Sequence, residues 1–584
     1  ELFGLDLENV KVNKLEQKQA DEALEHKFYA HKGYQPSYFY GDDIDWRYWP
    51  VKDNELRWQL HRHYWFIPLA KCYYTTGDAK YIDAWMDQYT DWVKKNPLDG
   101  VERLKAAGAS AAEIAAEKEN IRFAWRPMEA GRRLQDLLTE FALTIHSPRF
   151  TPRFLNLFLR TYRQHADHIL HNYSKQGNHL LFEAQRMLFA GIYFPEFREA
   201  QEWRRSGIEI LNREIGVQVY PDGMQFELDF GYHIAAIDIF LKALGMARAN
   251  GYEGEFPASY IETVGKMTAV TWNLLFPDWS NPMFGDTKSH DKNSLQRQFR
   301  SWSKVFPGDK QLQWFATEGR KGALPDYTSQ QFPESGFYVL RSGWDADATV
   351  MVLKAGPQGF WHCQPDNGTF ELWHRGRNFF PDSGSYVYAG DKEVTDQRNW
   401  FRQTQVHNTL TLDGRNLEHT DSKCLRWETD DATHIVTVGN PSYEGLTHRR
   451  TVWFVDRQFF VIADEASGTA EGEVGLHYNL VECDPAEDFA ACSAATRFSD
   501  GNNLLLKVFG AERMERREGW VSRTYRQRTE RPAYAFTVRK RAGKPVRLVT
   551  VLLPAEDAAG QRVEAVWRGN RLQVKINGTK YNLK

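Results

Sequence analysis

Cysteine is scarce in this chain of 584 residues, and its five cysteines are widely scattered. They show none of the close pairs that hold zinc in a knuckle or staple a small secreted domain, so both of those classes are excluded. Cys483 and Cys492 are near enough in the sequence to form a disulfide, but nothing else in the sequence favours that pairing.

An excess of one charge sign is also missing, since the formal net charge is -3. A balanced charge gives no support to a nucleic-acid or membrane-surface role. No uninterrupted apolar run approaches the roughly 20 residues that a membrane-spanning helix requires. We therefore expect neither a nucleic-acid nor a membrane partner, and we also expect a monomer.

Aromatic residues, in contrast, are abundant: Trp (20), Tyr (26) and Phe (36) together make up 14% of the chain. Most of them are expected in hydrophobic cores. Sugar-binding sites also use aromatic side chains, because a flat ring covers the apolar C–H faces of a sugar while its polar edge stays hydrated. The aromatic content is therefore compatible with both interpretations.

The two halves of the chain differ in texture, and its length favours more than one domain. Apolar residues recur at helical spacing from about residue 45 to about residue 314. The helical segments that we expect are 56–73, 78–92, 105–120, 121–143, 152–174, 179–194, 199–214, 235–250 and 259–275.

After about residue 333 the sequence turns to short β-rich runs separated by Gly, Asp and Asn. The strands that we expect are 337–340, 349–353, 409–412, 451–455, 459–462 and 547–553. Helices followed by strands predict an α+β multidomain chain, with a helical domain over 1–330 and an antiparallel β domain over 331–584.

Three separated polar groups suit the β-elimination of a uronic-acid polymer. This reaction requires a donor that neutralises the uronate carboxylate, a base that takes the C5 proton and an acid that protonates the departing O4. Asn178 can supply the neutral donor. It can equally be the N-cap of the helix that follows, and His179 beside it can share the first task or simply pack.

Tyr232 follows a Pro-Asp-Gly turn and stands between Gly231 and His233. A tyrosine ionises near pH ~10, so its use as a base requires nearby positive charge or hydrogen-bond donors. In glucuronate the C5 hydrogen and O4 lie on the same ring face, so one tyrosine can act first as base and then as acid. A buried aromatic role stays open.

His362 lies in a Gly- and Pro-rich loop that follows a predicted strand, a common place for a functional histidine. It can be the base for the opposite C5 epimer, or it can polarise Tyr232. A loop histidine that only packs is the alternative.

Gln364, Asp382 and His407 form a possible metal cluster. Asp and His are suitable Zn²⁺ ligands, whereas a Gln oxygen favours Ca²⁺ or no metal at all. Their irregular spacing is not specific. We expect at most one structural divalent ion, Ca²⁺ or Zn²⁺, and no organic cofactor.

These motifs together resemble the heparinase II/III-like polysaccharide lyases, and the heparinase III branch most closely. The resemblance covers most of the chain and is carried by residues 177–181, 222–233, 362–370, 381–384 and 407–410. It implies an incomplete (α/α) toroid followed by an antiparallel β-sandwich domain. It also implies that Asn178 neutralises the carboxylate, that Tyr232 is base and acid, and that His362 is the other catalytic group.

The metal and the branch follow from the same resemblance. Asp382 and His407 match positions that hold a structural metal in relatives. Zinc-bearing relatives carry His-x-His where this chain has His362-Cys363-Gln364, which leaves the identity and presence of a metal open. An Asn neutraliser at position 178 favours the heparinase III branch over the heparinase II type.

The implied substrate is heparan sulfate, whose sulfates and carboxylates call for arginine or lysine. Basic residues near the motifs are Arg122, Arg126, Arg186, Lys288, Arg375 and Arg402. The substrate-binding residues that we expect are His179, Arg186, Gln225, Glu227, His233, Trp361 and Arg402. Because the chain begins with Glu1 rather than Met, we also expect a removed signal peptide and a periplasmic location.

Three alternatives remain. A lyase for another uronate polymer, such as alginate, would use the same three groups. An inverting glycoside hydrolase would need two carboxylates about 6.5–9.5 Å apart, for which Glu183, Glu227, Asp229 and Asp286 are available. A glycan-binding protein without catalysis would need only the aromatic residues.

Overall fold

The computed structural model describes residues 6–30, 37–359, 361–388, 392–430 and 432–584, so Glu1 lies outside the described part. The chain forms two compact units. The first unit comprises Glu1–Ile215, Asp238–Pro257 and Ala389–Glu393, and the second comprises Gly216–Ile237, Ala258–Tyr388 and Val394–Lys584. The domain boundary expected between residues 330 and 331 stays a prediction.

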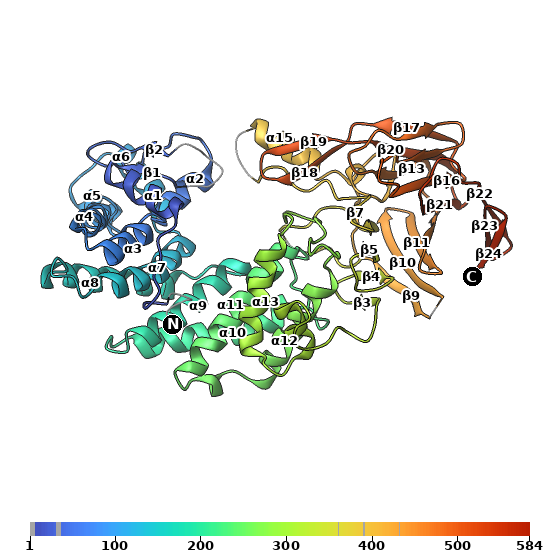
Figure 1. Cartoon of the computed structure of the whole chain (residues 1–584). Coiled ribbons are helices and arrows are strands. Elements are labelled where there is room, and N and C mark those ends of the chain that lie inside the picture. Colours follow the sequence, from blue (N-terminus) through green and yellow to red (C-terminus); the bar gives the residue numbers. More distant parts are fainter. Residues whose placement is uncertain (1–5, 31–36, 360, 389–391, 431) are drawn as a thin grey trace. The chain divides into compact units, whose positions relative to one another are not determined.

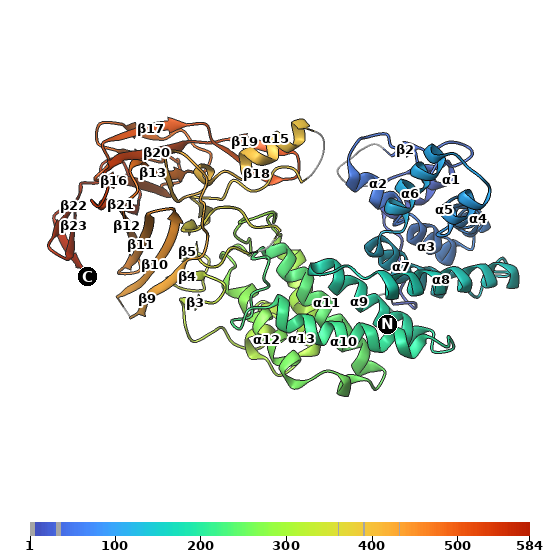
Figure 2. The same cartoon turned by 180° about the vertical axis from the view of Figure 1, so that it is seen from behind.

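The first unit is helical (Figures 1 and 2). Its elements are α1 (Lys14–Leu24), β1 (Lys27–Phe28), β2 (Tyr38–Phe39), α2 (Asn54–Leu60), α3 (Phe66–Thr76), α4 (Ala79–Lys95), α5 (Gly100–Ala106), α6 (Ala111–Ala124), α7 (Pro127–Thr144), α8 (Pro152–Asn172) and α9 (Gly177–Tyr193). Helices α10 (Ala200–Gln218) and α11 (Phe230–Ala249) cross the division between the units. Helix α7 packs against α3, α8 and α9.

Tryptophan rings form much of the first unit's core. Trp46, Trp65, Trp85, Trp92 and Trp203 are all buried there, within one continuous hydrophobic cluster. Their indole edges are used as well: Trp85, for example, donates to the Glu140 carboxylate at 2.8 Å. For these five residues the aromatic content reflects core packing, as was expected for most of the tryptophans.

Three of the expected helices are interrupted. The segment 56–73 is divided between α2 and α3, where His63 has a positive φ of 56°. The segment 105–120 is broken at Gly108, whose φ is +73°, and α6 restarts on a capping box between Ser110 and Glu113. The segment 121–143 is broken because Pro127 opens α7. Apolar residues keep their helical spacing across each break, so the breaks could not be recognised from this spacing.

The second unit combines antiparallel sheets with helices α12 (Ala258–Asn273), α13 (Lys292–Val305), α14 (Lys310–Thr317) and α15 (Lys392–Phe401). Its first sheet contains β3 (Gln330–Phe332), β4 (Phe337–Arg341), β5 (Thr349–Lys354), β6 (Thr369–His374) and β7 (Arg377–Asn378) in that order. The eight-stranded sheet has the order β14 (Ala486–Asp488), β15 (Ser493–Ala495), β16 (Asn503–Phe509), β21 (Val546–Ala555), β12 (Phe459–Ser467), β11 (Leu446–Val455), β10 (Thr433–Tyr443) and β9 (Lys423–Thr429).

A four-stranded sheet has the order β17 (Arg513–Arg517), β20 (Ala533–Lys540), β13 (Gly472–Asn479) and β8 (Leu410–Leu412). Strands β18 (Trp520–Thr524) and β19 (Gln527–Glu530) form a two-stranded sheet. A small three-stranded sheet contains β22 (Val563–Arg568), β23 (Arg571–Ile576) and β24 (Thr579–Leu583). All six expected strands are present, and every pairing is antiparallel. The expected order of helices before antiparallel sheets is confirmed.

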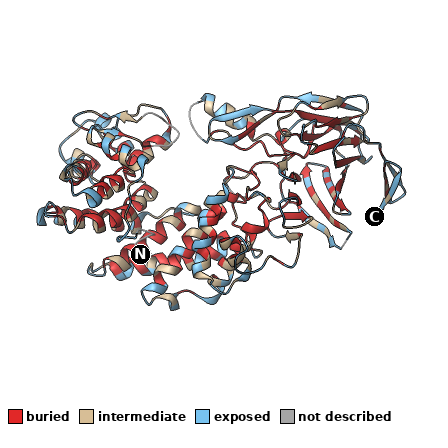
Figure 3. Cartoon of the chain, viewed as in Figure 1, coloured by how far each residue is buried: buried red, intermediate tan, exposed pale blue. Residues whose placement is uncertain are grey.

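The eight-stranded sheet is covered on both faces. Alternation along β11 sends Val452 and Phe454 into the main sandwich core and Trp453 and Val455 to the opposite face. There the small sheet β22–β24 covers them and forms a second, smaller core (Figure 1). Figure 3 shows the central strands largely buried. The sheet therefore presents no open apolar face along these residues.

Helix α11 is long and apolar enough to span a membrane by length and composition alone. Most of that stretch is buried inside the protein, as in a core helix of a folded domain. Its polar first turn bears Tyr232 and His233, which the site below uses. All five cysteines are free, so the possible disulfide between Cys483 and Cys492 does not form.

Candidate active site

Tyr232 lies in the first turn of α11, where the backbone is held from two sides. One oxygen of Asp229 accepts hydrogen bonds from the backbone N–H groups of Gly231 at 2.9 Å and Tyr232 at 3.1 Å. The Thr287 hydroxyl accepts from the same Gly231 N–H at 3.0 Å. Carboxylate capping of this kind fixes where a helix begins. The half-buried Tyr232 side chain therefore projects from a rigid point.

His362 stacks directly on Tyr232. The two ring centroids are 3.7 Å apart and the rings are inclined by 13°. His362 belongs to the loop between β5 and β6 and is only 6% exposed. Gly285 allows the close approach of this loop, since a Cβ at that position would come within 2.8 Å of the His362 carbonyl oxygen.

Asp286 holds His362 in one orientation. Its Oδ2 lies 2.8 Å from Nδ1 of His362 and accepts a hydrogen bond from Arg398 Nη2 at 2.7 Å. Burial alone would raise the pKa of Asp286, but the hydrogen bond from His362 and the charge of Arg398 hold that pKa below its usual range. An ionised Asp286 assigns the imidazole proton to Nδ1, so Nε2 of His362 is the acceptor.

Glu227 faces that acceptor nitrogen. Its Oε2 lies 4.0 Å from Nε2 of His362, and its side chain is buried. Burial raises the pKa of Glu227 to about 7, and the neighbouring Asp229 and Asp286 add to that effect. Near neutral pH, Glu227 therefore exists in both its protonated and its ionised form, so a second proton-carrying group lies beside the Tyr232–His362 stack.

Burial raises the pKa of Tyr232 above its ordinary value, and the neighbouring Tyr388 and Asp229 raise it further. Tyr232 is therefore a neutral phenol in this structure. Tyr388 also lies 5.8 Å from the His362 ring, centroid to centroid, and Arg398 lies 5.0 Å from the centroid of Tyr388. The resting arrangement suits Tyr232 as a proton donor, and a base role requires added positive charge.

Two expected substrate contacts prove to be buried structural groups. His233 is fully buried; its Nδ1 accepts from the Gln225 backbone N–H at 3.2 Å and its Nε2 donates to the Met267 carbonyl at 2.9 Å. Burial lowers the pKa of His233 to about 4, so it is neutral. Gln225 is also fully buried and accepts from the Glu227 backbone N–H at 2.9 Å. Both residues support the loop that presents Glu227, and neither is accessible to a substrate.

Arg402 and Trp361 flank His362 in different ways. Arg402 donates to the Cys363 carbonyl at 2.8 Å and so restrains the loop. Trp361, by contrast, is 72% exposed. A buried ion pair restrains the same loop, because Lys354 Nζ lies 2.8 Å from an Asp366 oxygen. Arg402 therefore has a structural partner, and Trp361 is the one expected contact in this loop with a widely exposed ring.

The remaining expected residues lie on α9 in the first unit. The N-cap of α9 is Gln176, so Asn178 is inside the helix and the N-cap role is wrong for it. Asn178 is half-buried and His179 is exposed. Arg186 is buried, lies 3.3 Å from the centroid of the Phe182 ring and hydrogen-bonds neighbouring glutamines, which identifies a packing role. The expected substrate contact of Arg186 is therefore not supported.

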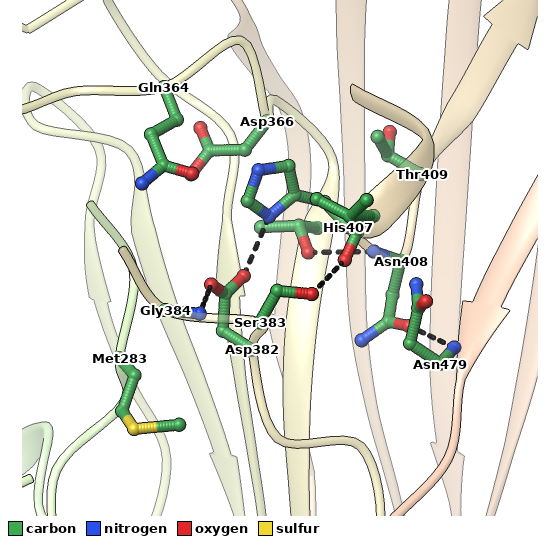
Figure 4. Close-up of polar contacts among 12 residues, drawn as sticks. Met283, Gln364, Asp366, Asp382, Ser383, Gly384, His407, Asn408, Thr409 and Asn479 are labelled. Atoms are coloured by element: carbon green, nitrogen blue, oxygen red, sulfur yellow. Dashed lines mark hydrogen bonds and ion pairs between the residues drawn. The ribbon is translucent and has the colours of Figure 1, made fainter. Parts of the chain in front are cut away.

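The three expected metal ligands lie in the second unit (Figure 4). Asp382 Oδ2 lies 2.7 Å from Nδ1 of His407, and Asp382 Oδ1 accepts from the Gly384 N–H at 2.9 Å. Gln364 donates its Nε2 to the Gly285 carbonyl at 2.8 Å. Within the described ranges, Nε2 of His407 and Oε1 of Gln364 are buried atoms without a hydrogen-bond partner.

This arrangement fits a metal with few protein ligands. A histidine that binds a metal usually donates its other ring N–H to a carboxylate or carbonyl, so Asp382 would orient His407 and Gln364 would add an oxygen. The described residues contain no group of three or more His, Cys, Asp or Glu placed to hold a metal. The donor set is therefore poorer than that of a typical structural zinc site.

Comparisons with known proteins decide the family. The heparinase II/III N-terminal model matches residues 2–314, and the heparinase II/III-like C-terminal model matches residues 325–557. The chain belongs to the heparinase II/III family. The resemblance noted from the motifs is thus confirmed.

Relatives in this family match nearly the whole chain. A heparin-sulfate lyase from Bacteroides stercoris is 51% identical, with 99% of this chain and 88% of the relative covered. A solved heparinase III is 50% identical with a TM-score of 0.87, covering 100% of this chain and 92% of the other. A heparan sulfate lyase from Pedobacter heparinus is 44% identical with a TM-score of 0.78, covering 99% and 90%. These likenesses confirm the predicted fold class of toroid and β-sandwich.

Sequence reasoning missed the residues that hold the heparinase-type site together. Asp229 and Asp286 were considered only as hydrolase carboxylates, and Arg398 and Tyr388 had no assigned role. No spacing signal connects positions 286, 362 and 398, because the fold alone brings them together. The Asp-Phe-Gly-Tyr run at 229–232 was the one available hint, since Asp is a favoured residue just before a helix.

Three of the four carboxylates considered for a hydrolase have other partners. Glu183 accepts from the Ser174 N–H and hydroxyl, both at 2.7 Å. Asp229 caps α11, and Asp286 binds His362 and Arg398. A hydrolase would need an acid and a base that are not committed in this way. Together with the family, these contacts set the hydrolase alternative aside.

Proposed function

We propose that this protein is a polysaccharide lyase that cleaves heparan sulfate by β-elimination at uronic acid, giving unsaturated uronate oligosaccharides. The structural observation that carries the chemistry is the Tyr232–His362 stack anchored by Asp286. The substrate rests on the relatives, which are named heparin-sulfate lyase or heparan sulfate lyase at 44% to 51% identity. They favour heparan sulfate over alginate and other uronate polymers.

In the proposed reaction the C5–H bond breaks and its electrons form the C4=C5 double bond while the C4–O4 bond breaks. The C5 proton passes to a base of the enzyme, and O4 leaves with a proton from an acid. Tyr232 acts as acid and as base on one ring face, and His362 is the other catalytic group. Because Nε2 of His362 is the acceptor nitrogen, His362 can take a proton while Asp286 stabilises the imidazolium.

The pKa of Tyr232 connects the two groups. A phenol that burial keeps neutral is a poor base, and a positive charge close to its ring would lower that pKa. Once His362 has taken a proton, the stacked imidazolium supplies such a charge at a centroid distance of 3.7 Å. We therefore propose that, once His362 has taken the C5 proton, the charge of the imidazolium assists Tyr232 in releasing its phenol proton to the departing O4.

Asn178 is proposed as the neutral donor to the uronate carboxylate. An ionised carboxylate is a poor electron sink, so the transition state requires a donor that shares the developing charge. The proposal rests on the resemblance carried by the 177–181 motif, and Asn178 lies half-buried in the first turn of α9. His179, exposed beside it, is proposed as a substrate contact, as are Glu227 and Trp361.

The test of the proposed function is ultraviolet absorbance over time with the purified protein and heparan sulfate. Elimination creates a conjugated C4=C5 uronate that absorbs, and hydrolysis does not. We expect absorbance to rise with heparan sulfate and to stay flat with alginate, and heparin should be run in parallel. A rise only with alginate would overturn the proposal that heparan sulfate is the substrate. A flat trace with new reducing ends would overturn the proposal that the reaction is an elimination.

We also propose a structural divalent ion, Ca²⁺ or Zn²⁺, held by His407 and Gln364 with Asp382 orienting the histidine. The two buried atoms without partners, Nε2 of His407 and Oε1 of Gln364, support this site. The ion would hold together the loops that bear these residues, and no step of the elimination depends on it. No organic cofactor is proposed.

Chelation should therefore lower the melting temperature by about 2–4 °C, as expected for a chain of this size when ~2.7 kcal/mol of binding free energy, that of an ion at about 100 times its Kd, is lost. Differential scanning calorimetry before and after dialysis against EDTA measures the change, and elemental mass spectrometry gives the metal content. The variant His407→Ala should contain no metal and should not respond to EDTA. A metal-free wild type that neither Ca²⁺ nor Zn²⁺ stabilises would contradict the site.

Three further expectations stay predictions from the sequence. They are a periplasmic location after removal of a signal peptide, a monomeric state, and the absence of nucleic-acid or membrane partners.

A further inference from the structure

A cavity lies in the second unit, on the outer face of the eight-stranded sheet beside the small sheet β22–β24. It has a volume of about 370 Å³, within the range of small-ligand sites. No residue of the candidate active site lines it. The side chains that matter to the argument are Arg426, Arg449, Arg547, Lys584, Trp453 and Trp567.

The strand pattern explains why cations gather there. Arg449 and Trp453 lie on the same face of β11, the face turned away from the main sandwich core. Arg449 pairs across the ladder with Glu465 of β12, which in turn pairs with Arg547 of β21. The row Arg449–Glu465–Arg547 thus crosses three adjacent strands at one edge of the cavity.

The cavity carries more positive than negative charge. Four cationic side chains and two acidic ones line it, and of the cations Arg426 is paired with Glu428, which lies outside the lining. Of the acids, Asp464 is buried on the core side and paired with Arg450 and His448, and Glu465 is paired with Arg547. Arg449 is exposed, and no ion pair to its guanidinium occurs in the described ranges. A ligand can therefore use Arg449 without breaking a contact within the protein.

One indole ring adds a surface for a sugar, because Trp567 is half-buried, whereas Trp453 is only 4% exposed and packs under the small sheet β22–β24. The Arg547 guanidinium lies 5.2 Å from the centroid of the Trp567 ring, and Nε1 of Trp567 is a buried donor without a partner among the described residues. Trp453 uses its Nε1, which donates to the Lys584 main-chain oxygen at 3.2 Å. Indole faces cover apolar sugar C–H groups, and guanidinium groups pair with sulfate or carboxylate oxygens.

We propose that this cavity binds a short sulfated segment of an acidic polysaccharide, as a second site apart from the candidate active site. The chemical class follows from the cations and the indole ring that line the cavity, and only the choice of heparan sulfate as the polymer rests on the proposed function. Arg449 meets a sulfate, and Trp567 contributes the accessible part of its ring. Such a site retains a long chain on the enzyme while the active site cleaves it elsewhere along its length.

The test uses the full chain and a heparan-sulfate tetrasaccharide whose carboxyl groups have been reduced. This probe keeps its sulfates but lacks the carboxylate that acidifies C5, so it is not eliminated whichever residue is the base. Isothermal titration calorimetry compares wild type, Arg449→Glu and Arg449→Ala. We expect one class of site to weaken by about tenfold in Arg449→Glu and less in Arg449→Ala, since charge reversal adds repulsion.

The matched control is Arg297→Glu, which makes the same charge change at an exposed arginine on α13 outside the cavity. It should leave the titration unchanged, and an equal loss in this control would overturn a specific site. Displacement of the probe by inorganic sulfate at the same sulfate concentration would show that the cavity binds small anions. That result would overturn the proposal that it binds a polysaccharide. Unchanged affinity in both Arg449 variants of normal melting temperature would overturn the proposal.

The elimination assay keeps this test separate from the proposed function. Cleavage of a short, unmodified heparan-sulfate tetrasaccharide by Arg449→Glu should stay within about twofold of wild type, since the cavity is apart from the Tyr232–His362 stack. A large loss on this short substrate would place Arg449 in the active site and overturn a second site. Failure of the lyase assay in wild type would leave the calorimetric result standing, because the probe requires no cleavage.

Discussion

The variant Tyr232→Phe should lose about 10³-fold in kcat on heparan sulfate, within the 10²–10⁴-fold range of general acid–base catalysis. The substitution removes only the phenol oxygen, which is the proposed proton carrier for C5 and O4. The phenylalanine ring can keep the stack on His362, whose centroid lies 3.7 Å away, so the fold should be preserved. The rise of ultraviolet absorbance measures the rate, and the melting temperature checks the fold.

The matched control for this substitution is Tyr581→Phe on β24, in the small C-terminal sheet. It removes the same atom far from the proposed chemistry in the sequence, and its kcat should equal that of wild type. Near-normal turnover by Tyr232→Phe would show that another group carries the proton, and the proposed mechanism would have to be abandoned.

The variant His362→Ala should also lose about 10²–10⁴-fold in kcat. It removes the acceptor Nε2 and, at the same time, the charge that would assist ionisation of Tyr232. Asp286→Asn is expected to lose less, because His362 remains but its tautomer and its imidazolium are no longer supported by a carboxylate. Asp286 is thus a positioning residue, and its variant should shift the pH profile of kcat as well as lower the rate.

The control here is His419→Ala, which removes an exposed histidine of the second unit and should leave kcat unchanged. In the double variant His362→Ala/Tyr232→Phe the losses should not add, since the two groups act as one unit. Additive losses would contradict the proposed coupling between the stacked rings. An unshifted pH profile in Asp286→Asn would contradict the positioning role of Asp286.

The main strands and the order of the two halves were predictable because their signals are local. In β11, for example, buried and exposed residues alternate along part of the strand, and this alternation can be read from the sequence. Helix ends were less predictable. Gly108 and Pro127 break helices at positions where the apolar periodicity continues, and a single backbone conformation outweighs that pattern.

Several of the expected substrate contacts are buried, which the sequence did not indicate. His233 directly follows Tyr232, and Arg186 lies on the same helix as the 177–181 motif, yet both are buried and bonded to neighbours within the protein. Successive helical residues point about 100° apart, so adjacency to a functional residue does not place a side chain in the same environment. Burial at such positions is decided by packing.

The sequence by itself determined the helical half, the β half, the family and the three polar groups proposed for catalysis. Those features are recorded in local periodicity and in the ordered motifs. Only the tertiary structure decided that Asp286 and Arg398 hold His362 against Tyr232, and that cations from β9, β11 and β21 line one cavity. Such groupings depend on contacts between residues far apart in the chain, and no local pattern encodes those contacts.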